Sequence, residues 1–187
     1  MTTIEWKPNQ SAPLWDIEGE GDVDSNGVCK LQGSFFTDLK IDHLRQSGPS
    51  CVPTTLAMLA NANGADVTPE HFMPFINSQS PHSWSEALAP FGMQLAYCNV
   101  DLRRLSFYMD ELMAMDDLFL LSFYSTDPPY EPDANGKLCT AHIVTLHRDT
   151  IIDTAKPEPI SAKDYSRQER QTKRIFRVVP RGHPRSV

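Results

Sequence analysis

One stretch of sequence decides how the chain folds: residues 46–61, Gln-Ser-Gly-Pro-Ser-Cys-Val-Pro-Thr-Thr-Leu-Ala-Met-Leu-Ala-Asn. Its first part contains Gly48-Pro49-Ser50, which is typical of a turn. The next part has the spacing of one stripe of a helix, which Gly64 can end: Val52, Leu56, Leu59, Ala60 and Asn63. The pattern therefore predicts a turn that leads directly into a helix, with Cys51 at or next to the N-cap.

A cysteine at a helix start is in a chemically distinctive place. Pro53 is tolerated in the first turn, because the backbone N–H groups there lack helical partners. Those N–H groups and the positive end of the helix dipole stabilise a thiolate, the reactive form of cysteine. The alternative is a structural role, since cysteine often serves as a small buried apolar residue. Cys51 is therefore a candidate nucleophile.

Length and composition indicate one globular domain. The chain has 187 residues, of which 40% are hydrophobic and 22% charged. It contains no apolar run of about 18 residues, and its N-terminus lacks the basic start and apolar segment of a signal peptide. Its four cysteines do not resemble the disulfide framework of a small secreted domain. We expect a cytoplasmic protein without membrane insertion, although export that needs no signal peptide stays open.

The net charge of −7 is unevenly distributed along the chain. Residues 161–187 carry eight Lys or Arg against two acidic residues, whereas the preceding part carries nine against 22. An acidic body argues against nucleic acid as a partner, because affinity for phosphate backbones depends on cationic side chains. We expect the basic segment to pack along the acidic body or to be solvated, the alternative being an acidic partner.

The chain is expected to divide into three parts. Residues 1–33 are rich in Gly, Asp, Glu, Asn and Pro and suggest an extended arm. Residues 34–180 form the predicted domain, and residues 181–187 a basic C-terminal tail.

Helices are expected in the first half of the domain. The second half of residues 34–44 alternates in polarity, which indicates a strand or extended segment before the cysteine turn. Thr68-Pro69-Glu70 predicts a short helix through about Ile76. Ser83-Trp84-Ser85-Glu86 fits a capping box, for a helix that ends near Gly92. Asp101 is expected to cap a helix with these apolar positions: Leu102, Leu105, Met109, Leu112 and Met113.

Strands dominate the second half. The continuous apolar run in residues 117–124 is typical of a buried central strand, and residues 93–100 and 174–179 also suggest strands. Residues 126–137 contain three prolines and predict a loop that borders the site. Residues 138–146 and 150–154 are two further predicted strands, joined by a turn at Arg148-Asp149. Helices followed by an antiparallel sheet indicate the α+β class.

His142 has a predicted partner on the neighbouring strand. Side chains alternate along a strand, so His142 and Val144 share one face and Cys139 points away from them. If the turn has two or four residues, Leu146 pairs with Ile151, and Asp153 lies diagonally opposite His142 at about 7–8 Å. A three-residue turn would break this register. With it, Asp153 can fix the tautomer of His142 and stabilise the imidazolium.

These residues resemble papain-like cysteine peptidases of the C39 type. Residues 51–58, Cys-Val-Pro-Thr-Thr-Leu-Ala-Met, are similar to the C-G-P-T-S-L-A-M run of that family, and residues 142–146 to its H-F/Y-V-V-L strand. Residues 150–153 resemble the strand that ends in the orienting Asp of the family. Two departures from its pattern matter for the site: Val52 replaces a glycine, and Thr154 replaces a proline. The resemblance covers roughly residues 40–155.

The resemblance implies a fold, a set of roles and a substrate. In this papain-like α+β fold, the helical N-terminal part carries the nucleophile helix and packs on a C-terminal antiparallel sheet. Cys51 would be the nucleophile, His142 the base, Asp153 the residue that orients it, and Gln46 a donor to the oxyanion. The reaction would hydrolyse a peptide or amide bond in a protein or peptide, without a cofactor. Relatives use the same triad for glutamine deamidation, transglutaminase reactions or other acyl transfer, or are silent interaction domains.

A metal-binding module is a weaker alternative. Residues 139–142 form a C-x-x-H motif, but structural zinc sites usually have four ligands in paired spacings, and no second pair is near in sequence. Strand alternation also turns Cys139 away from His142. We therefore expect no metal. The sequence leaves the oligomeric state and the identity of the substrate open.

Overall fold

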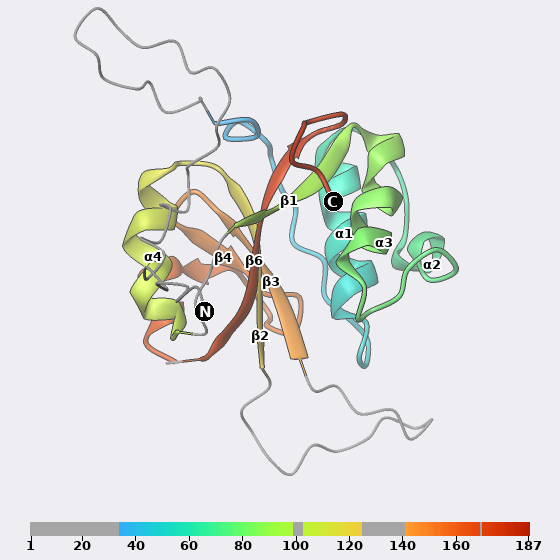
Figure 1. Cartoon of the computed structure of the whole chain (residues 1–187). Coiled ribbons are helices and arrows are strands. Elements are labelled where there is room, and N and C mark those ends of the chain that lie inside the picture. The colour runs from blue at the N-terminus through green and yellow to red at the C-terminus, as the bar shows by residue number, and fades with distance from the viewer. Residues whose placement is uncertain (1–33, 99–102, 125–140, 169) are drawn as a thin grey trace, which may run out of the picture. The chain divides into compact units, whose positions relative to one another are not determined.

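The computed structural model describes residues 34–98, 103–124, 141–168 and 170–187 (Figure 1). The expected arm in residues 1–33 and the expected loop in residues 126–137 lie outside these ranges. The described residues belong to one compact unit, Ser34–Val187. The division of the chain into arm, domain and tail stays a prediction.

The described residues form helices in the first half and mostly strands in the second. The helices are α1 (Cys51–Ala62), α2 (Pro69–Phe72), α3 (Pro81–Leu88), α4 (Leu105–Ala114) and α5 (Ala162–Ser166), with a 3₁₀ turn η1 (Ala89–Phe91) after α3. The strands are β1 (Met93–Cys98), β2 (Leu118–Tyr124), β3 (Ala141–His147), β4 (Thr150–Ile152), β5 (Ile160–Ser161) and β6 (Thr172–Pro180). The expected α+β class is confirmed.

The strands form one antiparallel sheet in the order β1-β6-β2-β3-β4-β5. Helices α1, α2 and α3 lie to one side of this sheet and α4 to the other (Figure 1). Strand β2 lies between β6 and β3, and its side chains are buried from Leu118 to Phe123. Coverage of both faces explains why β2 reads as a continuous apolar run rather than an alternating one.

Helix α1 is buried on all sides. Each side chain from Cys51 to Ala60 is buried, and α1 contacts α2, α3 and β3. Its apolar residues share one core cluster with residues of the sheet and of α2 and α3: Phe72, Trp84, Leu88, Leu118, Leu120, Ile143, Phe176 and Val178. The predicted helix is therefore confirmed, but it is a core helix rather than one with a single apolar stripe.

The segment before α1 has no strand, so the strand alternative for residues 34–44 is wrong. Side chains satisfy its backbone instead. The Asp117 carboxylate accepts hydrogen bonds from the backbone N–H groups of Phe35 (3.1 Å) and Phe36 (3.0 Å). The other carboxylate oxygen of Asp117 accepts from Arg177 Nε at 2.7 Å, and the two side chains are 0% and 5% exposed. A buried ion pair thus replaces a ladder of strand hydrogen bonds.

The end of α2 and the start of α3 differ from the predictions. Helix α2 begins at Pro69 with Thr68 as N-cap, as expected, but ends at Phe72 instead of Ile76, two residues before the helix-breaking Pro74. The capping box at Ser83 is wrong, because α3 begins earlier, at Pro81, with Ser80 as N-cap. Ser83 lies inside α3, where its hydroxyl donates to the carbonyl of Ser80 at 2.7 Å.

The helix expected from Asp101 begins at Leu105, with Arg104 as N-cap. Residues 99–102, which include the expected cap, lie outside the described ranges. The expected strand 150–154 is shorter, because β4 ends at Ile152.

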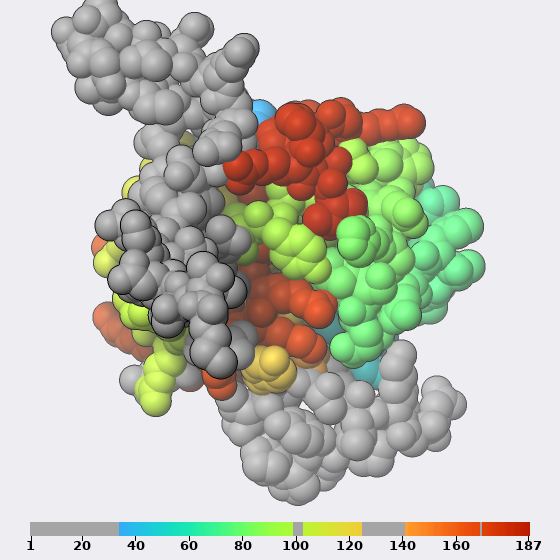
Figure 2. Space-filling model, viewed as in Figure 1, coloured from blue at the N-terminus to red at the C-terminus, as the bar shows by residue number. Residues whose placement is uncertain are grey.

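The basic C-terminal residues lie against β1. The N–H of Val187 donates to the carbonyl of Leu95 at 2.9 Å, and Ser186 forms an antiparallel bridge with Ala96. Figure 2 shows these red residues spread over the green part of the surface. Residues 181–187 therefore cover the edge of the sheet at β1, and covered edges do not pair with other chains. None of the helices described here combines the length and apolar character needed to cross a membrane.

Removing the charge of Asp117 is expected to destabilise the fold strongly. Asp117→Asn removes the negative charge from the buried ion pair with Arg177, so we expect the free energy of unfolding to fall by about 3–5 kcal/mol in urea titrations. The neighbouring Asp116 pairs with Arg148 on the surface, where the side chains are 53% and 56% exposed. Asp116→Asn is the matched control, with an expected change within about 1 kcal/mol. Equal losses in both variants would contradict this account of Asp117.

Candidate active site

The β3–β4 hairpin positions His142. Leu146 pairs with Ile151 and His147 with Thr150, so Arg148 and Asp149 form a two-residue turn. Arg148 has φ of 59°, as the first position of such turns requires. The register predicted for the hairpin is thereby confirmed. On its other edge β3 pairs with β2, which places Phe123 opposite His142.

His142 and Asp153 meet at this end of the hairpin. Nε2 of His142 lies 2.7 Å from Oδ1 of Asp153, and the two side chains are 13% and 3% exposed. An ionised carboxylate can only accept a hydrogen bond, so the proton of this bond is on Nε2. In a neutral imidazole the lone pair is then on Nδ1. The pair therefore has a defined tautomer, with Nδ1 as the nitrogen that can take a proton.

Asp153 is held by further donors. Its Oδ1 accepts from the backbone N–H of Ala155 at 2.9 Å, and its Oδ2 accepts from the hydroxyl of Tyr165 at 3.0 Å. Burial raises the pKa of the Asp153 carboxyl, but the hydrogen bonds and charge of His142, with those from Ala155 and Tyr165, outweigh burial and lower the pKa below its usual value. Asp153 is therefore an anion that stays ionised beside His142.

Tyr165 is a site residue that the sequence analysis missed. It lies on the short helix α5, is 1% exposed, and its pKa is raised by burial and by the negative charge of Asp153, so its hydroxyl keeps the proton that it donates. Helix α5 has too few residues to show a helical period. The sequence feature that indicates its start is Ser161, a residue type that is common at N-caps.

Aromatic rings enclose the pair. The Phe123 ring lies 6.2 Å from the His142 ring and 5.9 Å from the Tyr165 ring. The guanidinium of Arg170 lies over Phe123 and Tyr165, at 5.5 and 5.8 Å from their centroids. A cation over these faces is attracted to the ring electrons. Phe123, Tyr165 and Arg170 therefore pack together beside His142.

Cys51 is the first residue of α1. Its N-cap, Ser50, makes no side-chain hydrogen bond to the helix backbone, because the Ser50 hydroxyl donates to the carbonyl of Ser47 at 2.8 Å. The thiol therefore lies at the positive end of the helix dipole. Cys51 is 6% exposed and belongs to the same buried cluster as Ile143, the neighbour of His142 in β3. Val52, which replaces the glycine of the family pattern, packs into this cluster at 5% exposure.

Gln46 is hydrogen-bonded to Thr154, the residue after Asp153. Its backbone N–H donates to the carbonyl of Thr154 at 2.8 Å, and its Oε1 accepts from the Thr154 hydroxyl at 2.7 Å. Its Nε2 donates to the carbonyl of Gly48 at 2.9 Å. Nearby, Nε2 of His43 lies 3.2 Å from the carbonyl oxygen of Asp153. These contacts explain why β4 ends at Ile152: the next two residues bind residues 43–46 instead of a strand.

Metal binding finds no further support in the described ranges. Cys139, the partner of His142 in the C-x-x-H motif, lies outside them. Within them, no three or more His, Cys, Asp or Glu side chains are grouped so as to hold a metal ion.

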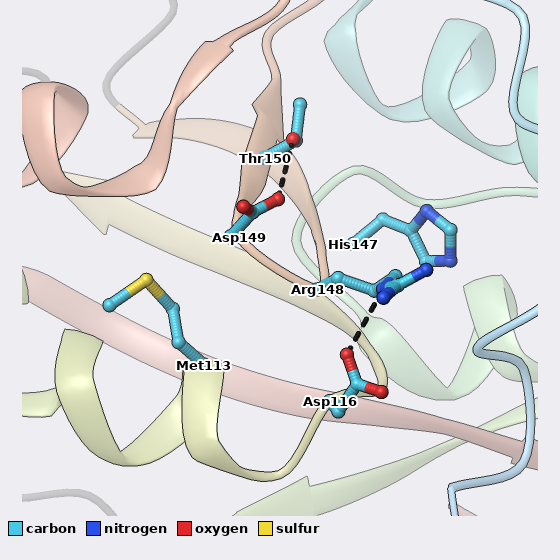
Figure 3. A pocket seen from close by; sticks show the side chains of 6 residues that line it. All are labelled: Met113, Asp116, His147, Arg148, Asp149 and Thr150. Atoms are coloured by element: carbon cyan, nitrogen blue, oxygen red, sulfur yellow. Dashed lines mark hydrogen bonds and ion pairs between the residues drawn. The ribbon is translucent and has the colours of Figure 1, made fainter.

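A hollow of about 400 Å³ lies at the opposite end of the hairpin (Figure 3). It is lined by Met113, Asp116, His147, Arg148, Asp149 and Thr150. His147 is five positions along β3 from His142, roughly 17 Å at the usual rise of a strand. In Figure 3 the Arg148 and Asp116 side chains bind each other at its rim. This hollow contains none of the predicted site residues.

Protonating Asp153 is expected to cost stability. Since its folded pKa is lowered, the carboxylate contributes stability that is fully present above the unfolded pKa of about 3.9 and is lost as the pH falls through the folded value. We expect Asp153→Asn to be less stable than wild type at about pH 7, and the gap to narrow towards about pH 3, in urea unfolding. Asp164→Asn, in an exposed ion pair with Arg167, is the control and should stay within about 1 kcal/mol of wild type. A gap for Asp153→Asn that is independent of pH would contradict the lowered pKa.

Comparisons with known proteins give structural likenesses only. No family model and no curated protein matches the chain. Among solved structures, it is similar to a double-glycine motif protease from an AMS/PCAT transporter in complex with the leader peptide, with TM-score 0.49 and 16% identity over 80% of this chain and 95% of that chain. It is also similar to the peptidase domain of Streptococcus ComA, a bifunctional ABC transporter involved in a quorum sensing pathway, with TM-score 0.48 and 12% identity over 75% and 97%.

A third similar chain, from Bacillus anthracis, is assigned to the C39-like peptidases, with TM-score 0.45 and 14% identity over 81% of this chain and all of that chain.

Proposed function

We propose that the protein is a cysteine-dependent hydrolase that cleaves a peptide or amide bond in a protein or peptide through a triad of Cys51, His142 and Asp153. The observation that carries this proposal is the buried 2.7 Å bond between Nε2 of His142 and Asp153. It leaves Nδ1 as the basic nitrogen of a histidine whose strand packs on the helix that Cys51 begins. A nucleophile, a base and a group that orients the base are the parts that covalent catalysis by a thiol needs.

In the acylation step, Nδ1 of His142 takes the proton of the Cys51 thiol, and the thiolate attacks the carbonyl carbon of the scissile bond. A carbon–sulfur bond forms, and the π electrons of the carbonyl move to its oxygen. Gln46 Nε2 and backbone N–H groups stabilise that oxyanion. When the carbonyl re-forms, the carbon–nitrogen bond breaks and the amine leaves with the proton from His142.

In the deacylation step, His142 takes a proton from water, and the resulting hydroxide adds to the thioester carbon. Collapse breaks the carbon–sulfur bond and releases a carboxylic acid, and the proton on His142 returns to the sulfur of Cys51. Asp153 stabilises the imidazolium in both steps without taking its proton. Use of a glutamine side chain as substrate would give deamidation, and attack by an amine would give a cross-link. Mass spectrometry separates these outcomes, because only peptide-bond hydrolysis creates new chain termini.

Selective alkylation tests the thiol without knowledge of the substrate. At about pH 6, a limiting amount of iodoacetamide should label Cys51 in preference to the other cysteines, since thiolate at a helix start persists where ordinary thiols are protonated. Cys98 is the internal control, because burial raises its pKa to about 12. Peptide mapping by mass spectrometry gives the labelled position. Equal labelling of the cysteines, or protection of Cys51, would favour a silent interaction domain.

Removing either reacting side chain should abolish turnover. Cys51→Ala and His142→Ala are each expected to lower kcat by about 10⁴-fold or more, because the members of a triad act as a unit. Asp153→Asn should have a smaller or equal effect, because Asp153 orients His142 rather than bonding to the substrate. The measurement is cleavage of a defined peptide library, followed by mass spectrometry of new termini.

Circular dichroism and urea unfolding show whether each variant is folded. Cys98→Ser is the matched control, as a second buried cysteine that the proposed mechanism does not use. Turnover like wild type in folded Cys51→Ala or His142→Ala protein would refute the triad.

A further inference from the structure

We propose that Thr154 is a positioning residue for the oxyanion hole: its hydroxyl fixes the orientation of the Gln46 side-chain amide. This inference rests on the proposed function, because it assigns a role within the same site. Thr154 replaces the proline of the family pattern that the sequence resembles. Proline has no hydroxyl, so the hydrogen bond from residue 154 to the Gln46 side chain is possible with the threonine of this chain but not with the proline of the pattern.

The orientation of the amide follows from its two partners. A backbone carbonyl can only accept, so the group of Gln46 that lies 2.9 Å from Gly48 O must be the NH₂ group. The oxygen of the amide then faces Thr154, whose hydroxyl donates to it at 2.7 Å. An amide flip would place the amide oxygen against the carbonyl oxygen of Gly48, two acceptors without a proton between them, so these two partners define one orientation.

Thr154 is a buried partner of Gln46. It is 0% exposed, whereas Gln46 is only half-buried. Its carbonyl also accepts the backbone N–H of Gln46 at 2.8 Å, so the backbone and side chain of Gln46 both bind the same residue. Thr154 directly follows Asp153. The residue that orients the proposed base and the residue that orients the proposed oxyanion donor are therefore adjacent in the chain.

Fixing the amide matters for the chemistry because a glutamine side chain has considerable rotamer freedom, which is lost when it binds. Gly48 O accepts one proton of the NH₂ group, and it also accepts the N–H of Ser50 at 2.9 Å, in the turn directly before Cys51. The second proton of the NH₂ group is then the one that can be donated to the oxyanion. Donors that are oriented before the reaction stabilise a developing charge without reorganising.

The test compares two reactions of Cys51 that differ in the oxyanion. Acylation by p-nitrophenyl acetate forms a carbon–sulfur bond through a tetrahedral oxyanion and expels p-nitrophenolate. Alkylation by iodoacetamide forms a carbon–sulfur bond and expels iodide, without an oxyanion. Both rates are measured at Cys51 by mass spectrometry of the full chain and its peptides. A residue that orients the oxyanion donor should affect only the first reaction.

For Thr154→Val, which removes the hydroxyl at nearly constant shape, we expect acylation to slow by about 10-fold to 100-fold and alkylation to change less than about twofold. Thr154→Ser keeps the hydroxyl and should remain within about threefold of wild type in both reactions. Gln46→Ala should slow acylation by about 10²-fold to 10³-fold. Adding Thr154→Val to Gln46→Ala should change acylation less than about twofold, because the hydroxyl acts through the amide.

The outcomes separate the two proposals. If Cys51 of the wild type is neither alkylated selectively nor acylated, the proposed function fails. If it reacts in both ways but Thr154→Val acylates like wild type, only the role of Thr154 fails. Additive effects of Thr154→Val and Gln46→Ala would also overturn that role. If Thr154→Val does not fold, Thr154→Ala is the second variant, with the same expected ratio of the two rates.

Discussion

The rest of the structure depends on the all-round burial of α1. A helix buried from Cys51 to Ala60 must be covered by the sheet on one side and by α2 and α3 on others, so these elements have to assemble around it. Its first turn has no side-chain cap, and packing rather than capping fixes where α1 begins. The thiol of Cys51 is therefore placed by the hydrophobic core, which is close-packed and tolerates little displacement.

The segment that leads to α1 is held in place by polar contacts. Residues 34–50 form no strand or helix, yet they are attached to the sheet at two ends of the hairpin region: Phe35 and Phe36 through Asp117, and Gln46 through Thr154. Buried polar groups are satisfied in this way when no ladder partner is present. The backbone of this segment is thus irregular, but hydrogen bonds that involve side chains fix its position against the sheet.

The sequence allowed much of this architecture to be predicted. Helix α1 and the central strand β2 follow from apolar spacing, and the register of the β3–β4 hairpin follows from strand alternation if the turn has two or four residues; these signals are local. The contacts of Thr154, Tyr165 and Asp117 could not be predicted. Each joins residues that are far apart in the chain or lies on an element too short to have a period, so no local pattern encodes it. The capping box at Ser83 was wrong because the proline at position 81 provides an equally good helix start.

The two-residue turn between β3 and β4 limits how the chain can vary in length. Side chains alternate along a strand, so a single inserted residue in this turn would turn every later side chain of β4 to the opposite face. Asp153 would then leave His142, and Thr154 would leave Gln46. Substitutions at Arg148 that suit positive φ, such as glycine or asparagine, are compatible with the fold, whereas the insertion or deletion of one residue is not. Homologous or engineered chains that keep this site should differ in the composition of the turn but keep an even number of residues in it.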